Sequence, residues 1–212
     1  MGSMEPGGLV YTFPATDELP EIAITSYRDE SQLDAIMALI AKDLSEPYSI
    51  FTFRRFVHGW PEFTLLAHAS DGALVGAIVC KSEFRERSQR TRGYVAMLAV
   101  EKAYRRCGLG RRLALEALHR MSATCNELSM ETEVTNTAAL RLYESLGFVK
   151  DKRLTRYYLN GNECVQRELG RRVRRAGLFY RPPSVHNANT HTHARAHSLP
   201  LRSAWRLKVW LG

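Results

Sequence analysis

The chain has 212 residues, of which 45% are hydrophobic and 25% are charged, and its formal net charge is +8 at pH 7. This length and composition are typical of one soluble domain with a hydrophobic core, and no run approaches the roughly 18 apolar residues of a membrane span. The four cysteines lack CxxC spacing, which argues against a secreted disulfide scaffold and favours the reducing environment of the cytoplasm.

The two ends of the chain differ in composition from its middle. Residues 1–19 lack the basic and apolar regions of a secretory signal, and we expect a disordered leader there. Residues 166–203 are rich in arginine, histidine and proline, which predicts a disordered insertion before a returning strand at 204–212. The folded domain is therefore expected at residues 20–165.

The first part of this domain has one strand pattern and two helix patterns. Residues 21–28 alternate apolar and polar side chains, which indicates a strand. Residues 33–44 carry apolar side chains at helical spacing, and Pro47 interrupts this helix. A second helix is predicted over 49–60, where a glycine and a proline end it.

A strand-rich region follows. The segments 63–70 and 73–84 are predicted strands, and Asp71-Gly72 between them is a strong hairpin signal. Residues 92–104 are predicted as a further strand, so a meander of antiparallel strands occupies the centre of the domain.

The last part of the domain alternates helices with strands. Helices are predicted over 109–121 and 136–146, with a strand over 127–134 between them, and residues 147–161 are predicted to form strand, turn and strand. The resulting fold class is α/β, with a mixed, mostly antiparallel twisted sheet of about seven strands, a central βαβ crossover and flanking helices.

The turn before the helix at 109–121 has the features of an anion-binding site. A helix N-terminus presents free backbone N–H groups, and Gly108 and Gly110 bring no side chain that would keep a ligand away. The arginines around the turn are Arg105, Arg106, Arg111 and Arg112. The spacing fits neither a nucleoside-triphosphate loop nor a dinucleotide fingerprint. By itself, the turn is equally compatible with a diphosphate site and with a plain glycine-rich loop.

Two motifs resemble one enzyme family. Arg105, Gly108 and Gly110 stand at the defining places of the Q/R-x-x-G-x-G/A motif of the GNAT superfamily of acetyltransferases, and NTAALRLYESLGF at 136–148 resembles its N-x-x-A-x-x-x-Y-x-x-x-G-F helix. The resemblance implies the GNAT fold and acetyl-CoA as co-substrate, with no metal.

Within the superfamily, the chain resembles the catalytic subunits of NatC N-terminal acetyltransferases. This resemblance runs from about Ile24 to Asn162 and includes KDLSEPYSIFTFRRFVHGWPEF, METEVTNTAALRLYESLGF and KRLTRYYLNG. It implies acetylation of nascent chains that begin with Met and a large apolar residue. It also implies partners, namely a large auxiliary subunit, a small Sm-like subunit and the ribosome. Residues 166–203 depart from the family, which passes almost directly to its last strand.

The resemblance also implies where coenzyme A binds. In the family the pyrophosphate lies on the glycine turn, and the pantetheine arm pairs with a bulged strand. Asn136 is expected to contact coenzyme A, although it also fits a helix N-cap alone. The expected cofactor-binding residues are Met97, Leu98, Ala99, Val100, Arg105, Arg106, Gly108, Leu109, Gly110 and Asn136.

Acetyl transfer to an amine needs a base for the amine and an acid for the thiolate. A peptide α-amine has a reference pKa of about 7.7–8.0, against about 10.4 for lysine, so it needs only modest help from a base. Glu131 and Glu133 share one face of the strand at 127–134, and the resemblance selects Glu131 as the base. A solvent-facing role is the alternative, mainly for Glu133. Tyr143 is the expected acid, and core packing is the alternative for its ring.

Substrate selection is assigned to a loop and to nearby tyrosines. In the family, the loop after the first helix and the tyrosines of the RYYL segment enclose the first two residues of the peptide. The expected substrate-binding residues are Leu44, Glu46, Tyr48, Tyr94 and Tyr158.

Other functions remain open at this level. The GNAT scaffold also serves lysine and small-amine acetyltransferases, and the arginine-rich tract 167–175 fits a ribosome- or RNA-binding module without sequence-specific nucleic-acid recognition. The histidines at 186, 191, 193 and 197 lack a rigid scaffold and a cysteine partner, so no metal site is predicted there.

Overall fold

The computed structural model describes residues 7–13, 20–43, 48–158 and 162–169, and all structural statements below refer to these. Its strands are β1 Leu9–Phe13, β2 Ile22–Ser26, β3 Thr64–Ala69, β4 Leu74–Arg85, β5 Arg90–Val100, β6 Glu127–Glu133, β7 Val149–Leu154 and β8 Cys164–Leu169. Its α-helices are α1 Leu33–Ala41, α2 Ile50–Gly59, α3 Leu109–Thr124 and α4 Thr137–Ser145. Three short 3₁₀ segments are η1 Glu30–Gln32, η2 Pro61–Phe63 and η3 Lys102–Tyr104. No described helix is both long and apolar enough to cross a membrane.

One sheet contains all the described strands, in the order β1-β2-β3-β4-β5-β6-β8-β7. Strands β1 to β5 pair with their sequence neighbours in antiparallel fashion, and β5 pairs with β6 in parallel. Because α3 connects β5 to β6, these three elements form a βαβ crossover. The predicted mixed, mostly antiparallel α/β sheet is confirmed, with eight described strands in place of about seven.

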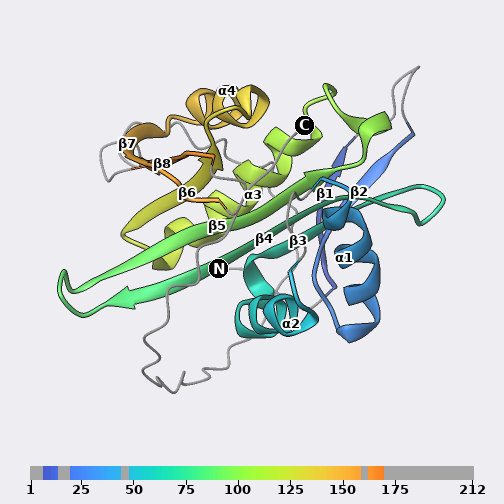
Figure 1. Cartoon of the computed structure of the whole chain (residues 1–212). Coiled ribbons are helices and arrows are strands. Elements are labelled where there is room, and N and C mark those ends of the chain that lie inside the picture. The colour runs from blue at the N-terminus through green and yellow to red at the C-terminus, as the bar shows by residue number, and fades with distance from the viewer. Residues whose placement is uncertain (1–6, 14–19, 44–47, 159–161, 170–212) are drawn as a thin grey trace.

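The helices cover both faces of the sheet. α1 and α2 lie on one face, and α3 and α4 lie on the other (Figure 1). Each face has its own apolar core: Ile36, Phe53 and Met97 belong to the core under α1 and α2, whereas Leu113 and Tyr143 belong to the core under α3 and α4. The apolar spacing predicted at residues 33–44 agrees with α1, whose Leu33, Ile36 and Ile40 are buried.

Helix α3 lies close to the sheet because β4 carries a glycine beneath it. A Cβ atom on Gly76 would lie 2.9 Å from Leu113 Cδ1, which is closer than side chains normally approach. Leu113 is fully buried at this contact. The position of α3, and of the turn at its N-terminus, thus depends on tight packing at one place.

The sheet parts between β5 and β6. Their parallel pairing runs from Arg92–Glu127 only as far as Val95–Met130. The next residue of β5, Ala96, forms a bulge, because Val79 pairs with Met97 and Cys80 with Val95. Beyond this point β5 continues beside β4 alone, while β6 continues beside β8. The predicted bulged strand is therefore present.

Two predictions about the ends of the chain are wrong in part. Residues 9–13, placed in a disordered leader, form β1, because Tyr11 to Phe13 pair with β2 and pack on the core. Residues 166–169, placed in a disordered insertion, belong to β8, whose Cys164, Val165 and Leu169 are buried. The predicted strand at 204–212 and the rest of the insertion lie outside the described residues.

Replacing Leu113 with Ala should lower the free energy of unfolding by about 2–5 kcal/mol, because the smaller side chain would leave a cavity between α3 and Gly76. Urea denaturation measures this change. His119→Ala, on the exposed side of the same helix, should change the free energy of unfolding by less than about 0.5 kcal/mol. Equal effects of the two substitutions would contradict the packing described here.

Candidate active site

The glycine turn leads directly into α3. Gly108 is the N-cap residue with φ +91°, in the left-handed region, and it has no side chain to cap the helix. Arg106 also has a positive φ, of +68°. Gly110 lies against the end of β5, where an added Cβ would be 3.5 Å from Val100 Cγ2. The first N–H groups of a sixteen-residue helix are thus left for an acceptor from outside the helix.

The arginine that begins the motif points back to the sheet. Arg105 Nε donates to the carbonyl of Val100 at 2.8 Å, and its guanidinium forms an ion pair with Asp43 just after α1. The Asp43 side chain is only 6% exposed, so this is a nearly buried pair. Arg105 therefore fixes the turn to β5 and to the end of α1. No motif in the sequence singled out Asp43.

The remaining arginines of the turn divide into two kinds. Arg112 Cζ lies 3.4 Å from the centre of the Tyr11 ring, and the guanidinium is 2.5 Å from Glu116, so β1 and α3 hold it. Arg106 and Arg111 are exposed, and no ion pair is described for either. These two are the arginines best placed to meet a bound anion.

The end of β5 offers a free backbone edge. Residues 97–100 pair with β4 on one side, and none of the described strands pairs with their other side. Met97, Leu98 and Ala99 are buried, so their backbone edge borders an apolar surface. Such an edge can accept an extended ligand through backbone hydrogen bonds.

Asn136 caps α4, as one of the two predictions stated. Its Oδ1 accepts from Ala139 N at 3.0 Å, and Gly147, with φ +87°, follows the helix as its C-terminal cap. The Nδ2 of Asn136 is buried and has no hydrogen-bond partner among the described residues. A buried donor without a partner costs free energy, so it marks a place where a ligand acceptor fits.

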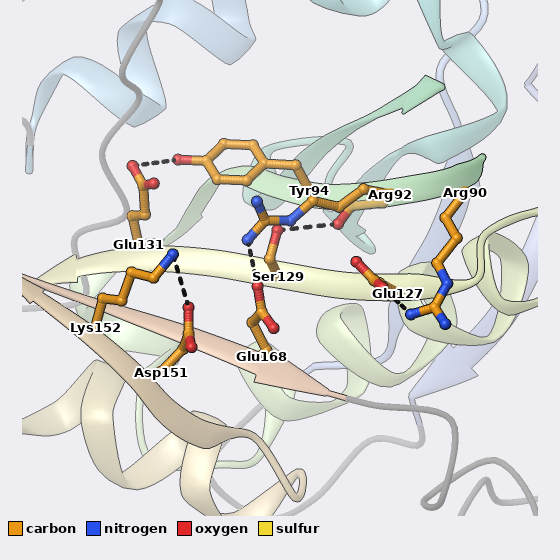
Figure 2. Close-up of polar contacts among 10 residues, drawn as sticks. Arg90, Arg92, Tyr94, Glu127, Ser129, Glu131, Asp151, Lys152 and Glu168 are labelled. Carbon is orange, nitrogen blue, oxygen red and sulfur yellow. Dashed lines mark hydrogen bonds and ion pairs between the residues drawn. The ribbon is translucent and has the colours of Figure 1, made fainter. Parts of the chain in front are cut away.

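Glu131 lies at the centre of a group of tyrosines. Tyr94 Oη on β5 donates to Glu131 Oε2 at 3.2 Å, and Figure 2 shows the carboxylate of β6 facing this phenol. Tyr157, in the segment between β7 and β8, donates to the same oxygen. Burial, followed by the charge of Glu131, raises the pKa of Tyr94 well above its usual value, so Tyr94 remains a donor at neutral pH. Oε1 of Glu131 accepts no hydrogen bond from the described residues.

Tyr157 is a site residue that the sequence reasoning missed. The predicted substrate residue of the RYYL segment was its neighbour Tyr158, whose ring meets that of Tyr157 edge to face at 5.1 Å. Tyr158 is only 5% exposed, and its pKa is raised by burial and by Cys164. The signal was the tyrosine pair itself, because two adjacent tyrosines in one segment are equally good candidates to reach a site.

Glu133 is not the solvent-facing residue that was the favoured alternative for it. Its side chain is buried and accepts a hydrogen bond from Asn162. It contributes to the raised pKa of Tyr158. Glu131 and Glu133 therefore both face the segment between β7 and β8, as their alternation on the strand predicted.

The predicted peptide-binding residues are only partly described. Tyr94 lies beside Glu131, and Tyr48 lies near enough to contribute to the raised pKa of Tyr94. The Tyr48 ring meets Phe53 of α2 edge to face at 6.0 Å. Leu44 and Glu46 lie outside the described residues.

Tyr143 is fully buried in the core under α3 and α4. Its ring meets that of Phe148 edge to face at 5.6 Å, and its hydroxyl has no hydrogen-bond partner in the part of the chain that the structure describes. Burial, followed by the nearby Cys80, raises its pKa, so the hydroxyl keeps its proton. Tyr143 and Glu131 lie on opposite faces of the sheet, and the place where β5 and β6 part lies between them.

Comparisons with known proteins agree on one family. The model described as "Acetyltransferase (GNAT) family" matches residues 33–148. Human N-alpha-acetyltransferase 30 is 51% identical over 149 residues, which are 70% of this chain and 41% of the human protein. The Schizosaccharomyces pombe protein of that name is 46% identical over 146 residues, covering 68% of this chain and 95% of the relative. The chain spans about half, or less, of the vertebrate relatives that it matches.

A solved structure supports the same comparison. A chain in the crystal structure of the NatC complex bound to Gag peptide and CoA superimposes with a TM-score of 0.67 at 42% sequence identity. The match covers 70% of this chain and 98% of that chain.

Replacing Asn136 with Ala should destabilise the protein by about 1 kcal/mol, because α4 would lose its N-cap. Asn136→Ser keeps a capping oxygen and should retain most of the stability. Thermal or urea unfolding of the two variants measures the difference. If both variants were as stable as the parent, the cap would contribute nothing.

Proposed function

This chain belongs to the GNAT acetyltransferase family, and we propose that it is an N-terminal protein acetyltransferase of the NatC type. It would transfer acetyl from acetyl-CoA to the α-amine of nascent chains that begin with Met and a large apolar residue. One observation carries this proposal: Glu131, held by two tyrosine hydroxyls, lies where β5 and β6 part.

The residues present fit coenzyme A. Arg106, Gly108, Leu109 and Gly110 would hold its pyrophosphate, because the helix end offers N–H groups without a capping side chain. The free edge of residues 97–100 would hold the pantetheine arm, and the unpartnered Nδ2 of Asn136 would donate to it. Arg105 would act by holding the turn. When bound, acetyl-CoA supplies the thioester whose acetyl group is transferred.

Glu131 is the proposed base. Because Tyr94 and Tyr157 both donate to Oε2, they stabilise the carboxylate and leave Oε1 to take the proton of the incoming amine, directly or through water. An α-amine is already neutral in a sizeable fraction near its pKa of about 7.7–8.0, so a carboxylate is a sufficient base. This argument favours an α-amine over lysine as the substrate.

Tyr143 is the proposed acid. The amine nitrogen attacks the acetyl carbon, the carbon–sulfur bond breaks, and the Tyr143 hydroxyl gives its proton to the departing sulfur. The Tyr143 hydroxyl has no acceptor among the described residues, which supports this role, because its proton is available to the departing sulfur. Because the base and the acid lie on opposite faces of the sheet, the thioester would lie between them, where β5 and β6 separate.

The proposed peptide-binding residues are Leu44, Glu46, Tyr48, Tyr94 and Tyr158. Burial of one large apolar side chain of the peptide contributes about 1.5–3 kcal/mol, which is enough to distinguish Leu from Ser or Ala at the second position.

The proposed partners are one large auxiliary subunit, a small Sm-like subunit and the ribosome, with the cytoplasm as the place of action. The likeness to a chain of a solved NatC complex supports the auxiliary subunits. Arg167 is buried and pairs with Glu144 at 2.7 Å, so it is not available to bind RNA as the alternative function requires. The rest of that arginine tract lies outside the described residues.

An acetyl-CoA assay on peptides tests the function. The full chain, alone and co-expressed with auxiliary subunits, would be given Met-Leu-, Ser- and Ala-starting peptides and a lysine peptide with a blocked N-terminus. We expect acetylation of the Met-Leu- peptide. Acetylation confined to the lysine peptide would replace this proposal with the lysine alternative, and no acetylation of any peptide would refute both.

Glu131→Gln should lower kcat by about 10²-fold or more, because the amide cannot accept the amine proton. The affinity for coenzyme A should stay unchanged, as measured by calorimetry. Glu127→Gln is the matched control, since Glu127 lies on the same strand and pairs with Arg90 at 2.7 Å. Full turnover in the Glu131 variant would remove this residue from the mechanism.

A further inference from the structure

Lys81 has no part in the mechanism above, yet it lies beside Tyr94, which donates to the proposed base. It stands on β4 directly opposite Tyr94 of β5. Its side chain is only 13% exposed, which is unusual for lysine. The ammonium lies 5.6 Å from the centre of the Tyr94 ring and 5.9 Å from that of Phe56.

These distances are typical of cation–π contacts, which are strongest where water is excluded. Phe56 is almost fully buried, so one ring of this pair is fixed by the core under α1 and α2. Lys81 therefore connects a rigid part of the core to Tyr94. The Tyr94 ring carries the hydroxyl that donates to Glu131 Oε2 at 3.2 Å.

The ammonium of Lys81 also pairs with Glu83. Glu83 Oε1 is 2.5 Å from the ammonium, but its side chain is 53% exposed, so solvent screens it. The ionisable groups around Tyr94 and Glu131 are Tyr48, Glu133, Tyr157, Tyr158 and Cys164. Arg92, two residues before Tyr94 on β5, is a second cation in this region, and its guanidinium pairs with Glu168 at 2.9 Å.

We propose that Lys81 is a positioning residue, which holds the Tyr94 ring so that its hydroxyl donates to Glu131. This inference rests on the proposed function, because it gives Lys81 an effect on catalysis only if Glu131 is the base.

The test uses Lys81→Met, which keeps an apolar stem of similar length, and Lys81→Arg, which keeps the cation. Lys81→Met should lower kcat by about three- to tenfold with the KM for acetyl-CoA unchanged, and Lys81→Arg should retain at least about half of kcat. Glu83→Gln is the matched control and should keep kcat within about twofold. Loss of activity in both Lys81 variants, or in neither, would overturn the proposal.

A double-mutant cycle with Tyr94→Phe separates positioning from a general structural role. Lys81→Met should have little further effect on kcat in the Tyr94→Phe background, because the hydroxyl that Lys81 positions is absent. An equal loss in both backgrounds would refute positioning through Tyr94.

A second double-mutant cycle combines Lys81→Met with Tyr94→Ala, which removes the ring. Both cycles are measured by urea unfolding, a readout that needs no activity. Coupling between Lys81 and the Tyr94 ring is expected there, and additive changes would refute the contact itself. If no variant and no parent acetylated the peptide while the unfolding cycle showed coupling, the proposed function would fail and the contact would stand.

Discussion

The end of the parallel pairing between β5 and β6 is the constraint on which the site depends. Up to Val95 and Met130 the two strands share hydrogen bonds, and after the bulge at Ala96 each has a different neighbour. A parallel pair is joined by a crossover helix, and the helix that joins these strands begins at the glycine turn. The free strand edge, the helix N-terminus and the carboxylate of Glu131 therefore follow from one feature of the topology.

Strand β8 completes the site on the β6 side of the place where β5 and β6 separate. By pairing with β6 from Glu131 to Glu133, it sets the position of the segment that precedes it. That segment brings Tyr157 to Glu131 and Asn162 to Glu133, so both carboxylates on this face of β6 have hydrogen-bond donors. Glu133 is buried and Glu131 is partly buried, and carboxylates shielded from water need such donors. The site thus combines a crossover unit with an antiparallel pair far along the chain.

The sequence predicted most of the fold because the local signals were strong. Periodicity located the four helices, Asp71-Gly72 located the hairpin, and Asn136 was recognised as a cap. Contacts between distant segments were not predictable in the same way. The ion pair between Asp43 and Arg105 joins residues 62 positions apart, and neither residue type alone indicates a partner. β1 and β8 were missed because polar and glycine-rich surroundings hid short strands whose burial depends on the sheet.

The ion pair between Arg105 and Asp43 has an evolutionary consequence. The first place of the family motif accepts glutamine as well as arginine, and a glutamine there would bring no charge to the end of α1. A nearly buried carboxylate without its cation would then be unfavourable. Lineages that exchange arginine for glutamine at this place are expected to lose the acid as well, so the two positions should covary although they lie in different elements.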